Sequence, residues 1–413
     1  MRAPVYVATL AAALFSVPAT ATTAVAAATA AAATPAAEEE CKTKYSQRMA
    51  SSIIARGQGV FTGLGGASEA LQAGIVQKAF TALSAHDPAS AATYGQYVRV
   101  SATSTIPFLS NALTDSLTYP MDRLSNGNAL LALSTAKGSL YRVAADALRE
   151  SINLNRRNSE GGLWYFVYPY WSYLDGMYSL APFYTLYSLT RPGSNNTASL
   201  DDMLLQFDLL WRHTRHNTTG LLSHGYDASR TAVWADPVTG ASPYVWGRSL
   251  GWYTMALVDT IEILEKNKAP SKYKASLLDK FENLMPAVLK AVDPRTGGWW
   301  QIVDQPGRAG NYIESSATAM FSYSLLKGAR LGYLPKKLVP AAAIVGARAQ
   351  KYLTDHFVVE NADGTLGWNG TVAVCSLNST ASYEYYVGQP ILYNSVLGSA
   401  SYVLASVEVE KLR

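Results

Sequence analysis

A single carboxyl group lies between aromatic side chains in the segment 170–178, which reads YWSYLDGMY. Asp175 comes two positions after Tyr173, and an apolar stretch begins at Met177. One interpretation is structural, because an Asp in the first turn of a helix caps free N–H groups and suits the helix dipole. The chemical interpretation is a general acid, since a carboxyl group with apolar neighbours can hold a proton and deliver it to a substrate.

Two further polar side chains have surroundings that suit ligand binding. Arg248 lies within 244–252, which reads YVWGRSLGW, and His224 lies within 223–227, which reads SHGYD. A guanidinium group held by aromatic rings can bind a carboxylate through two parallel hydrogen bonds. The alternatives are a structural ion pair for Arg248 and a core histidine for His224.

Aromatic residues gather in segments rich in glycine and proline, namely GGLWY at 161–165, YPYW at 168–171 and GGWW at 297–300. Aromatic rings at helix ends are suited to stacking on the C–H faces of sugars. Each ring alone is better explained by core packing, but several in one set of loops favour a carbohydrate cleft.

The elements that must position these residues are helices. Apolar residues recur at helical spacing, and clusters of Gly, Pro and Asn separate the periodic windows, whereas strand-like alternation is rare. The spacing predicts helices over 69–83, 141–154, 175–189, 200–213, 249–266, 271–292, 315–331, 341–356 and 394–409. We therefore expect an all-α fold, and a ring of six helical hairpins, the (α/α)6 barrel, suits this chain length.

The N-terminal segment has the order of a secretory signal peptide. Arg2 is followed by an apolar stretch over 5–17 and by small residues around Ala19. The alternative, a membrane anchor, needs a longer apolar stretch. We expect a signal peptide at 1–21, a low-complexity Ala/Thr segment at 22–40, and one catalytic domain at 41–413 in a secreted, extracellular protein.

Export places the two cysteines, Cys41 and Cys375, in an oxidising compartment, so a disulfide between them is one hypothesis and two separate buried thiols are the other. Four glycosylation sequons point to a secreted glycoprotein. They begin at Asn195, Asn217, Asn369 and Asn378.

The charge balance excludes one class of partner. The net charge is +4 over 413 residues, with no long basic run, which is not the pattern of a nucleic-acid-binding protein. Neither cysteine lies in a His or Cys cluster, so no metal site is expected. The partner that the aromatic loops favour is an oligosaccharide, and we expect a monomer that binds no membrane once the signal peptide is removed.

Several of these segments resemble the unsaturated rhamnogalacturonyl hydrolases, glycoside hydrolase family 105. The resemblance is collinear from residue 119 to the C-terminus, and its most specific parts are the Leu-Asp-Gly sequence at 174–176 and the Arg and Trp residues of 246–252. The remaining matches are MDRLSNG at 121–127, GGLW at 161–164, SYEYY at 382–386 and GSA at 398–400.

The resemblance implies an (α/α)6 barrel with a site at one mouth of the ring and no cofactor. It identifies Asp175 as the catalytic residue and Asp122 as a supporting carboxylate. It further implies that substrate contacts come from Trp164, Tyr173, His224, Arg248 and Trp252. The chain departs from the family pattern at two places: Tyr165 and Phe166 stand where His and Lys are common, and Tyr173 stands where the family has Trp.

The substrate implied is an oligosaccharide with a Δ4,5-unsaturated galacturonyl group at its non-reducing end, usually linked to rhamnose. Such a group is a vinyl ether, so we expect hydration of its double bond, with Asp175 acting first as acid and then as base. Other hypotheses are an unsaturated glucuronyl hydrolase, a polysaccharide lyase, a mannanase or rhamnosidase, and a non-catalytic wall protein. An ordinary glycosidase needs two carboxylates across the bond, and helix capping accounts for the pair Asp201 and Asp202.

Overall fold

A computed structural model describes residues 44–66, 68–134, 138–191 and 196–412. The predicted signal peptide at 1–21, the segment at 22–40, Cys41 and the sequon asparagine Asn195 lie outside the described residues. From Lys44 onward the chain forms one compact unit.

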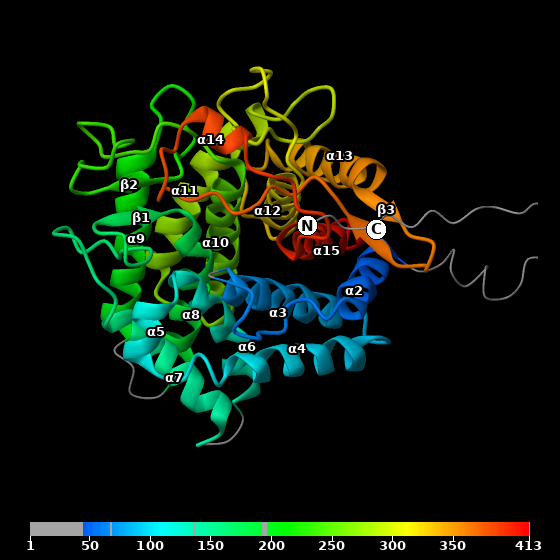
Figure 1. The fold of residues 1–413 in the computed structure, drawn as a ribbon, viewed down its shortest axis with the longest axis horizontal. Helices are drawn as coiled ribbons and strands as arrows, with labels where there is room; N and C mark the ends of the chain where they lie inside the picture. The colour runs from blue at the N-terminus through cyan, green and yellow to red at the C-terminus, as the bar shows by residue number, and fades with distance from the viewer. Residues whose placement is uncertain (1–43, 67, 135–137, 192–195, 413) are drawn as a thin grey trace, which may run out of the picture. The chain divides into compact units, whose positions relative to one another are not determined.

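Six helical segments form the inner layer of a closed ring, and their labels can be followed in Figure 1. Each contacts the next in the order given, and the last contacts the first. They are α3 (Glu69–His86), η1 with α6 (Met121–Asn126 and Gly127–Leu133), α8 (Asp175–Thr190), α10 (Gly247–Lys266), α12 (Ser315–Arg330) and α15 (Val396–Glu410).

An outer helix packs against each inner one, which makes six hairpins. The outer helices, in the same order, are α4 (Ala91–Thr105), α7 (Leu140–Asn153), α9 (Asn196–Thr214), α11 (Ser271–Lys290), α13 (Val339–Phe357) and α2 (Tyr45–Ala55). The last pair joins the two ends of the described chain, because α2 packs on α15. The predicted all-α (α/α)6 barrel is confirmed.

The burial of each helix follows its sequence. Inner helices such as α12 and α15 are buried on nearly every side, so apolar and small residues occupy all their faces. The outer helix α7 buries only one stripe, which includes Ala144, Leu148 and Ile152. This difference explains why the spacing of apolar residues is clearest in the outer helices.

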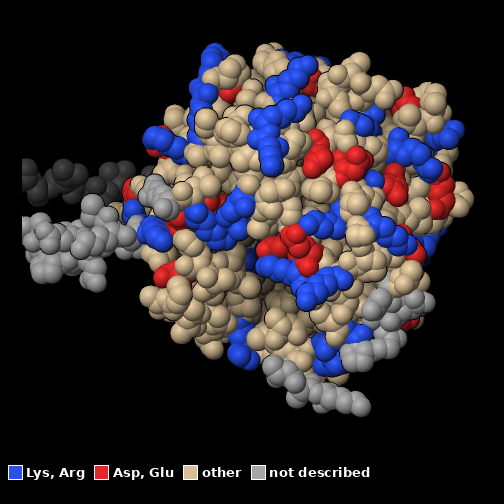
Figure 2. Space-filling view, turned by 180° about the vertical axis from the view of Figure 1, so that it is seen from behind, with Lys and Arg blue, Asp and Glu red and all other residues tan. Residues whose placement is uncertain are grey.

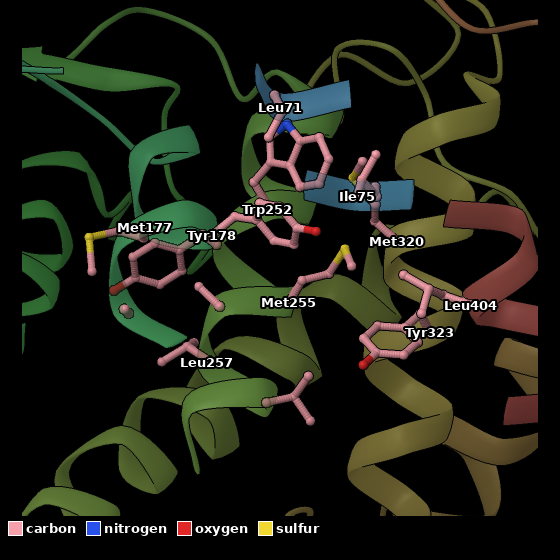
Figure 3. Close-up of a cluster of buried hydrophobic side chains, with 14 of the residues drawn as sticks. Leu71, Ile75, Met177, Tyr178, Trp252, Met255, Leu257, Met320, Tyr323 and Leu404 are labelled. Carbon is pink, nitrogen blue, oxygen red and sulfur yellow. The ribbon is translucent and has the colours of Figure 1, made fainter. Parts of the chain in front are cut away.

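Large apolar side chains from the inner helices fill the ring. Figure 3 shows Leu71 of α3, Tyr178 of α8, Trp252 of α10 and Met320 of α12 pointing toward one another. The interior of the barrel is therefore a packed core, and a substrate can enter only from one of its ends.

Long connections precede the inner helices, while the links inside the hairpins are mostly short. The long connections carry two antiparallel strand pairs, the helix α5 (Ala112–Thr118) and the short helix α14 (Tyr383–Val387). The strands are β1 (Trp171–Tyr173) with β2 (Gly225–Asp227), and β3 (Val358–Glu360) with β4 (Leu366–Trp368). The β1–β2 pairing places Tyr173, two residues before Asp175, opposite Gly225, which directly follows His224.

The nine helices predicted from spacing all occur, with ends that differ by a few residues. The spacing did not predict α2, α4, α5, η1, α6 or α14. In α4, for example, buried Tyr94 and Val98 share a turn with many polar or small residues, so the periodic signal is weak.

Two observations, one on the surface charges and one on the hydropathy of the helices, bear on the binding partners of the protein. Figure 2 shows Lys and Arg interspersed with Asp and Glu over one face of the molecule, without a large field of one sign. Among the described residues, no helix has the length and hydropathy needed to cross a bilayer.

Candidate active site

A cavity with an empty volume of about 580 Å³, its open mouth included, lies where inner helices begin. Its lining includes Ser68 before α3, Asp175 at the start of α8, Arg248 at the start of α10 and Leu397 at the start of α15. The N-terminal ends of several helices therefore converge on one space. The positive ends of their dipoles favour an anionic ligand there.

Asp175 is the first residue of α8 and is 7% exposed. Its Oδ2 atom accepts a hydrogen bond from the hydroxyl of Ser249 and lies 3.3 Å from Nε2 of His224. The carboxyl group also lines the cavity, so one side is held by protein groups while another faces the ligand space. This is the arrangement that a positioned acid or base requires.

His224 is fully buried behind Asp175 and is not among the residues that line the cavity. Its Nδ1 atom lies 2.8 Å from the hydroxyl oxygen of Tyr386, and its backbone carbonyl accepts a hydrogen bond from the N–H of Leu174. The structure thus places His224 in contact with the catalytic candidate, where the resemblance implied contact with substrate.

Ser249 is a functional candidate that sequence reasoning missed as an individual residue. Its hydroxyl reaches Asp175 and also lies 3.2 Å from the backbone carbonyl of His224. The available signal was its position beside Arg248 in the segment 246–252, but a serine in the first turn of a helix ordinarily indicates no more than capping.

Arg248 is buried but lines the cavity. Its two terminal nitrogens donate to the carbonyls of Val372 and Ala373, each at 2.6 Å, and Nη1 lies 3.8 Å from Glu314. The guanidinium also lies 4.8 Å from the ring centroid of Trp246. Arg248 therefore forms a structural ion pair and also lines the cavity. It holds in place the segment 372–376, which forms part of the cavity wall.

Asp122, in η1, is 3% exposed and lines the same cavity. Burial raises the pKa of Asp122 to about 7, with the nearby charge of Asp175 acting in the same direction and Tyr165 and Arg123 acting against it. Its Oδ1 atom has no hydrogen-bond partner among the described residues. The structure brings together the two carboxyl groups that the sequence analysis selected.

Aromatic side chains form much of the remaining wall. Tyr165 and Tyr173 stack with ring centroids 4.3 Å apart and an interplanar angle of 8°, and both line the cavity. Trp252 lines it as well and packs on Tyr178. Trp164 does not line the cavity; it packs against Tyr170 instead, with ring centroids 5.1 Å apart.

Other residues of the sequence analysis have structural roles. Asp202 forms a two-point pair with Arg157, and Asp201 pairs with Lys272, so both carboxylates have structural roles. The predicted capping role is wrong, because α9 begins at Asn196 and both residues lie beyond its first turn. Cys375 is buried in the cavity wall, where burial raises the pKa of its thiol to about 12. Its pairing with Cys41 stays a prediction. Within the described ranges, no three His, Cys, Asp or Glu side chains are grouped to hold a metal ion.

Known proteins resemble this chain in sequence and in fold. The sequence profile of Glycosyl Hydrolase Family 88 matches residues 72–413. The "24.9 kDa protein in picA locus" of Rhizobium radiobacter is 34% identical over 215 residues, which are 51% of this chain and 90% of that protein.

Solved structures extend this comparison to nearly the whole chain. A family 105 glycoside hydrolase from C. acetobutylicum is 33% identical, with a TM-score of 0.75 over 89% of this chain and 100% of that one. The unsaturated glucuronyl hydrolase of Bacillus sp. GL1 shares the fold at 13% identity, with a TM-score of 0.64 over 89% of this chain and 95% of that one.

Proposed function

The chain belongs to glycosyl hydrolase family 88, and from this premise we propose that it releases the Δ4,5-unsaturated galacturonyl residue from the non-reducing end of lyase-generated rhamnogalacturonan fragments. The observation that carries the proposal is one cavity that collects Asp175, Asp122 and Arg248. An unsaturated uronide is an anion with a reactive double bond, and these groups offer it a proton donor and a cation.

The charges of the cavity suit a carboxylate ligand. Arg248 is the one Lys or Arg among the described residues that line it, and the helix N-termini add their partial positive charge. The rings of Trp252 and Tyr173 provide apolar surfaces for the sugar faces. These features support an anionic terminal sugar held against the two aspartates.

The first chemical step is protonation of the double bond. The proton of the Asp175 carboxyl group goes to C4, and the electron pair of the C4–C5 bond forms the new C–H bond. Positive charge then develops on C5 and the ring oxygen. The ionised carboxylate of Asp175, held by the Ser249 hydroxyl and in contact with His224, stabilises this developing positive charge.

The second step is addition of water to C5. Asp175, now a carboxylate, accepts a proton from the water as its oxygen bonds to C5. The resulting hemiketal opens to a ketone, and the hemiacetal left at C1 collapses and expels the neighbouring sugar. One carboxyl group thus acts first as acid and then as base. This is consistent with the position of Asp175, whose side chain is held by protein groups on one side and faces the cavity on the other.

The direct test is Asp175→Asn. The variant should lose at least about 10²-fold in kcat/KM, because a missing general acid–base costs that much or more. The assay follows the decrease in ultraviolet absorbance of the unsaturated uronide. Asp201→Asn, which changes a carboxylate paired with Lys272 on the outer surface, serves as the matched control and should keep its activity.

A panel of lyase-generated disaccharides tests the substrate class. Unsaturated galacturonyl-rhamnose should be consumed fastest, with unsaturated glucuronyl disaccharides as competitors and saturated disaccharides as blanks. An increase in absorbance on intact polysaccharide would identify a lyase and contradict the proposal. Binding of every sugar without turnover would also contradict the proposal and would favour a non-catalytic protein.

Export and glycosylation are part of the same proposal. The signal-like segment 1–21 supports secretion, and the side chains of Asn217, Asn369 and Asn378 are exposed, as glycan attachment requires. N-terminal sequencing of protein from the culture medium, with and without enzymatic removal of N-glycans, tests both. A mature protein that still begins at Met1 would contradict export.

A further inference from the structure

Tyr386 reaches the surroundings of Asp175 from a distant part of the chain. It lies in α14, and its side chain is fully buried. Gln301 holds it there: Nε2 of Gln301 donates to the carbonyl of Tyr386 at 3.1 Å, and Oε1 of Gln301 accepts from Nε1 of Trp246 at 3.1 Å. One buried amide therefore fixes both the backbone of Tyr386 and the ring of Trp246.

The imidazole of His224 is enclosed by aromatic rings. Its centroid lies 4.8 Å from that of Trp246, 5.1 Å from that of Tyr173 and 5.9 Å from that of Tyr386. The side chain has no exposed surface. Because such close packing leaves the ring one orientation and excludes water, both ring nitrogens depend on protein groups for their hydrogen bonds.

The neighbour of Nδ1 decides which ring nitrogen carries the proton. Nδ1 lies 2.8 Å from the hydroxyl oxygen of Tyr386, and among the described residues His224 is the one hydrogen-bond partner of that hydroxyl. A buried hydroxyl with one partner donates to it, because a hydroxyl that only accepts leaves its own proton unpaired. Burial raises the pKa of Tyr386 well above its ordinary value, so the phenol keeps this proton.

Nδ1 is therefore the acceptor, and the proton of the neutral ring is on Nε2. Nε2 lies 3.3 Å from Oδ2 of Asp175. It makes no other hydrogen bond within the part of the chain that the structure describes. The carboxylate of Asp175 is thus the group that this N–H can serve.

We propose that Tyr386 is a positioning residue that fixes the tautomer of His224, with the proton on Nε2 and directed at Asp175. This inference rests on the proposed function and deepens it. Ser249 and His224 both contact Oδ2, which leaves Oδ1 as the oxygen that holds the proton delivered to C4. In the second step the same two donors support the carboxylate while it accepts a proton from water.

The opposite tautomer would turn the lone pair of Nε2 toward the carboxylate of Asp175. Two acceptors at this distance repel each other, so the carboxyl group would move or would hold its proton on Oδ2, between the protein groups. Loss of the Tyr386 hydroxyl admits both tautomers. It should slow proton transfer and leave sugar binding intact, because neither Tyr386 nor His224 lines the cavity.

Nitrogen NMR spectra of the intact protein with isotope-labelled histidine test the tautomer directly. The chain has five histidines, and the signals that disappear in His224→Asn belong to His224. In wild type we expect a protonated, pyrrole-type Nε2 and an unprotonated, pyridine-type Nδ1. In Tyr386→Phe both signals should move toward the average of the two forms. A protonated Nδ1 in wild type, or spectra that Tyr386→Phe leaves unchanged, would overturn the inference.

Kinetics show whether the tautomer serves catalysis. Tyr386→Phe keeps the ring, and we expect kcat to fall about tenfold while KM stays within about threefold of wild type. The matched control is Tyr383→Phe in the same helix, whose hydroxyl donates to the carbonyls of Arg308 and Ala309. Both of its constants should stay within about twofold of wild type.

A double variant shows whether Tyr386 acts through His224. The amide of Asn does not reach Asp175, so in a His224→Asn background Tyr386→Phe should cause no further loss in kcat. A tenfold further loss in that background would contradict the inference.

The spectra and the rates also separate this inference from the proposed function. If the substrate panel shows no turnover but the spectra show the expected tautomer, the control of His224 by Tyr386 stands and the proposed function fails. If the panel shows turnover but Nδ1 carries the proton in wild type, the inference fails and the proposed function stands.

Discussion

At the scale of single residues, the surroundings of Asp175 show which neighbouring side chains can contact a substrate and which can only support Asp175. His224 touches Asp175 on one side and Tyr386 on the other, and it has no exposed surface. A residue in that position can orient a carboxyl group but cannot bind a sugar directly. Its contribution should therefore appear in kcat rather than in KM.

Replacement of His224 by Asn and by Gln tests this role. The amide of Gln can take the place of Nε2 beside Asp175, whereas the shorter Asn amide cannot reach it. We expect His224→Asn to lose about 10²-fold in kcat and His224→Gln to lose less, with KM little changed in both. Equal losses in both variants, confined to KM, would show that His224 binds substrate; circular dichroism confirms that each variant folds.

The raised pKa of Asp122 predicts how activity depends on pH. Below about pH 7 the group is neutral, and above it a second negative charge lies beside Asp175 and repels the incoming uronate. Activity should therefore fall as pH rises through about 7. Rate profiles on an unsaturated disaccharide check this, and in Asp122→Asn the fall near pH 7 should disappear, even if the remaining rate is low.

At the scale of elements, a glycine in α10 determines how closely two inner helices approach each other. A Cβ atom at Gly251 would lie 2.9 Å from the Cβ of Met320 in α12, which is closer than two carbons can pack. The start of α10 carries Arg248, Ser249 and Trp252, so the distance between α10 and α12 also fixes the cavity wall.

Gly251→Ala should destabilise the protein by about 1–3 kcal/mol, because overpacking forces the two helices apart. Gly95→Ala in the outer helix α4 is the control, since a Cβ there meets nothing within 4 Å and alanine favours a helix; it should stabilise the protein by up to about 1 kcal/mol. Denaturant unfolding measures both. Equal effects at the two positions would contradict close packing at Gly251.

At the scale of the whole molecule, a largely buried charge network spans the ring beyond the apolar core. Lys78 of α3 lies 2.6 Å from Asp259 of α10, and Lys327 of α12 lies 2.6 Å from the same carboxylate and from Glu262. Helices α3 and α10 are not neighbours in the ring. The network therefore joins opposite sides of the barrel. Its residues lie farther along the helices than the N-terminal ends that line the cavity.

Asp259→Asn should cost about 3–5 kcal/mol in the free energy of unfolding, because the buried Lys327 and the partly exposed Lys78 lose their shared partner. Burial alone would raise the pKa of Asp259, but Lys327 and Lys78 outweigh it and lower the pKa to about 2. A lowered pKa stabilises the fold above about pH 4, and this stabilisation is lost as pH falls toward 2. Acid unfolding of wild type and variant measures the difference, while KM should be unaffected.

The sequence alone determined most of the helices and the catalytic candidates. Apolar spacing is strong where one stripe faces the core, so four of the six outer helices, α7 among them, could be predicted, and wholly buried helices such as α12 are apolar enough to be recognised. Asp175 and Arg248 could be selected because carboxyl and guanidinium groups among aromatic residues are chemically unusual, whereas Asp122 was implied only by the family resemblance. Short or mixed segments such as α4 and η1 gave no comparable pattern.

Only the tertiary structure decided which of these residues share a cavity. His224 is adjacent in space to Tyr386, 162 positions later in the chain, and Arg248 is held by the carbonyls of Val372 and Ala373. Such contacts depend on closure of the ring, which brings the N-terminal ends of inner helices together and which no local periodicity encodes. For the same reason Trp164 and His224, which the resemblance implied as substrate contacts, proved to lie outside the cavity lining, while Ser249 proved to contact the carboxyl group of Asp175.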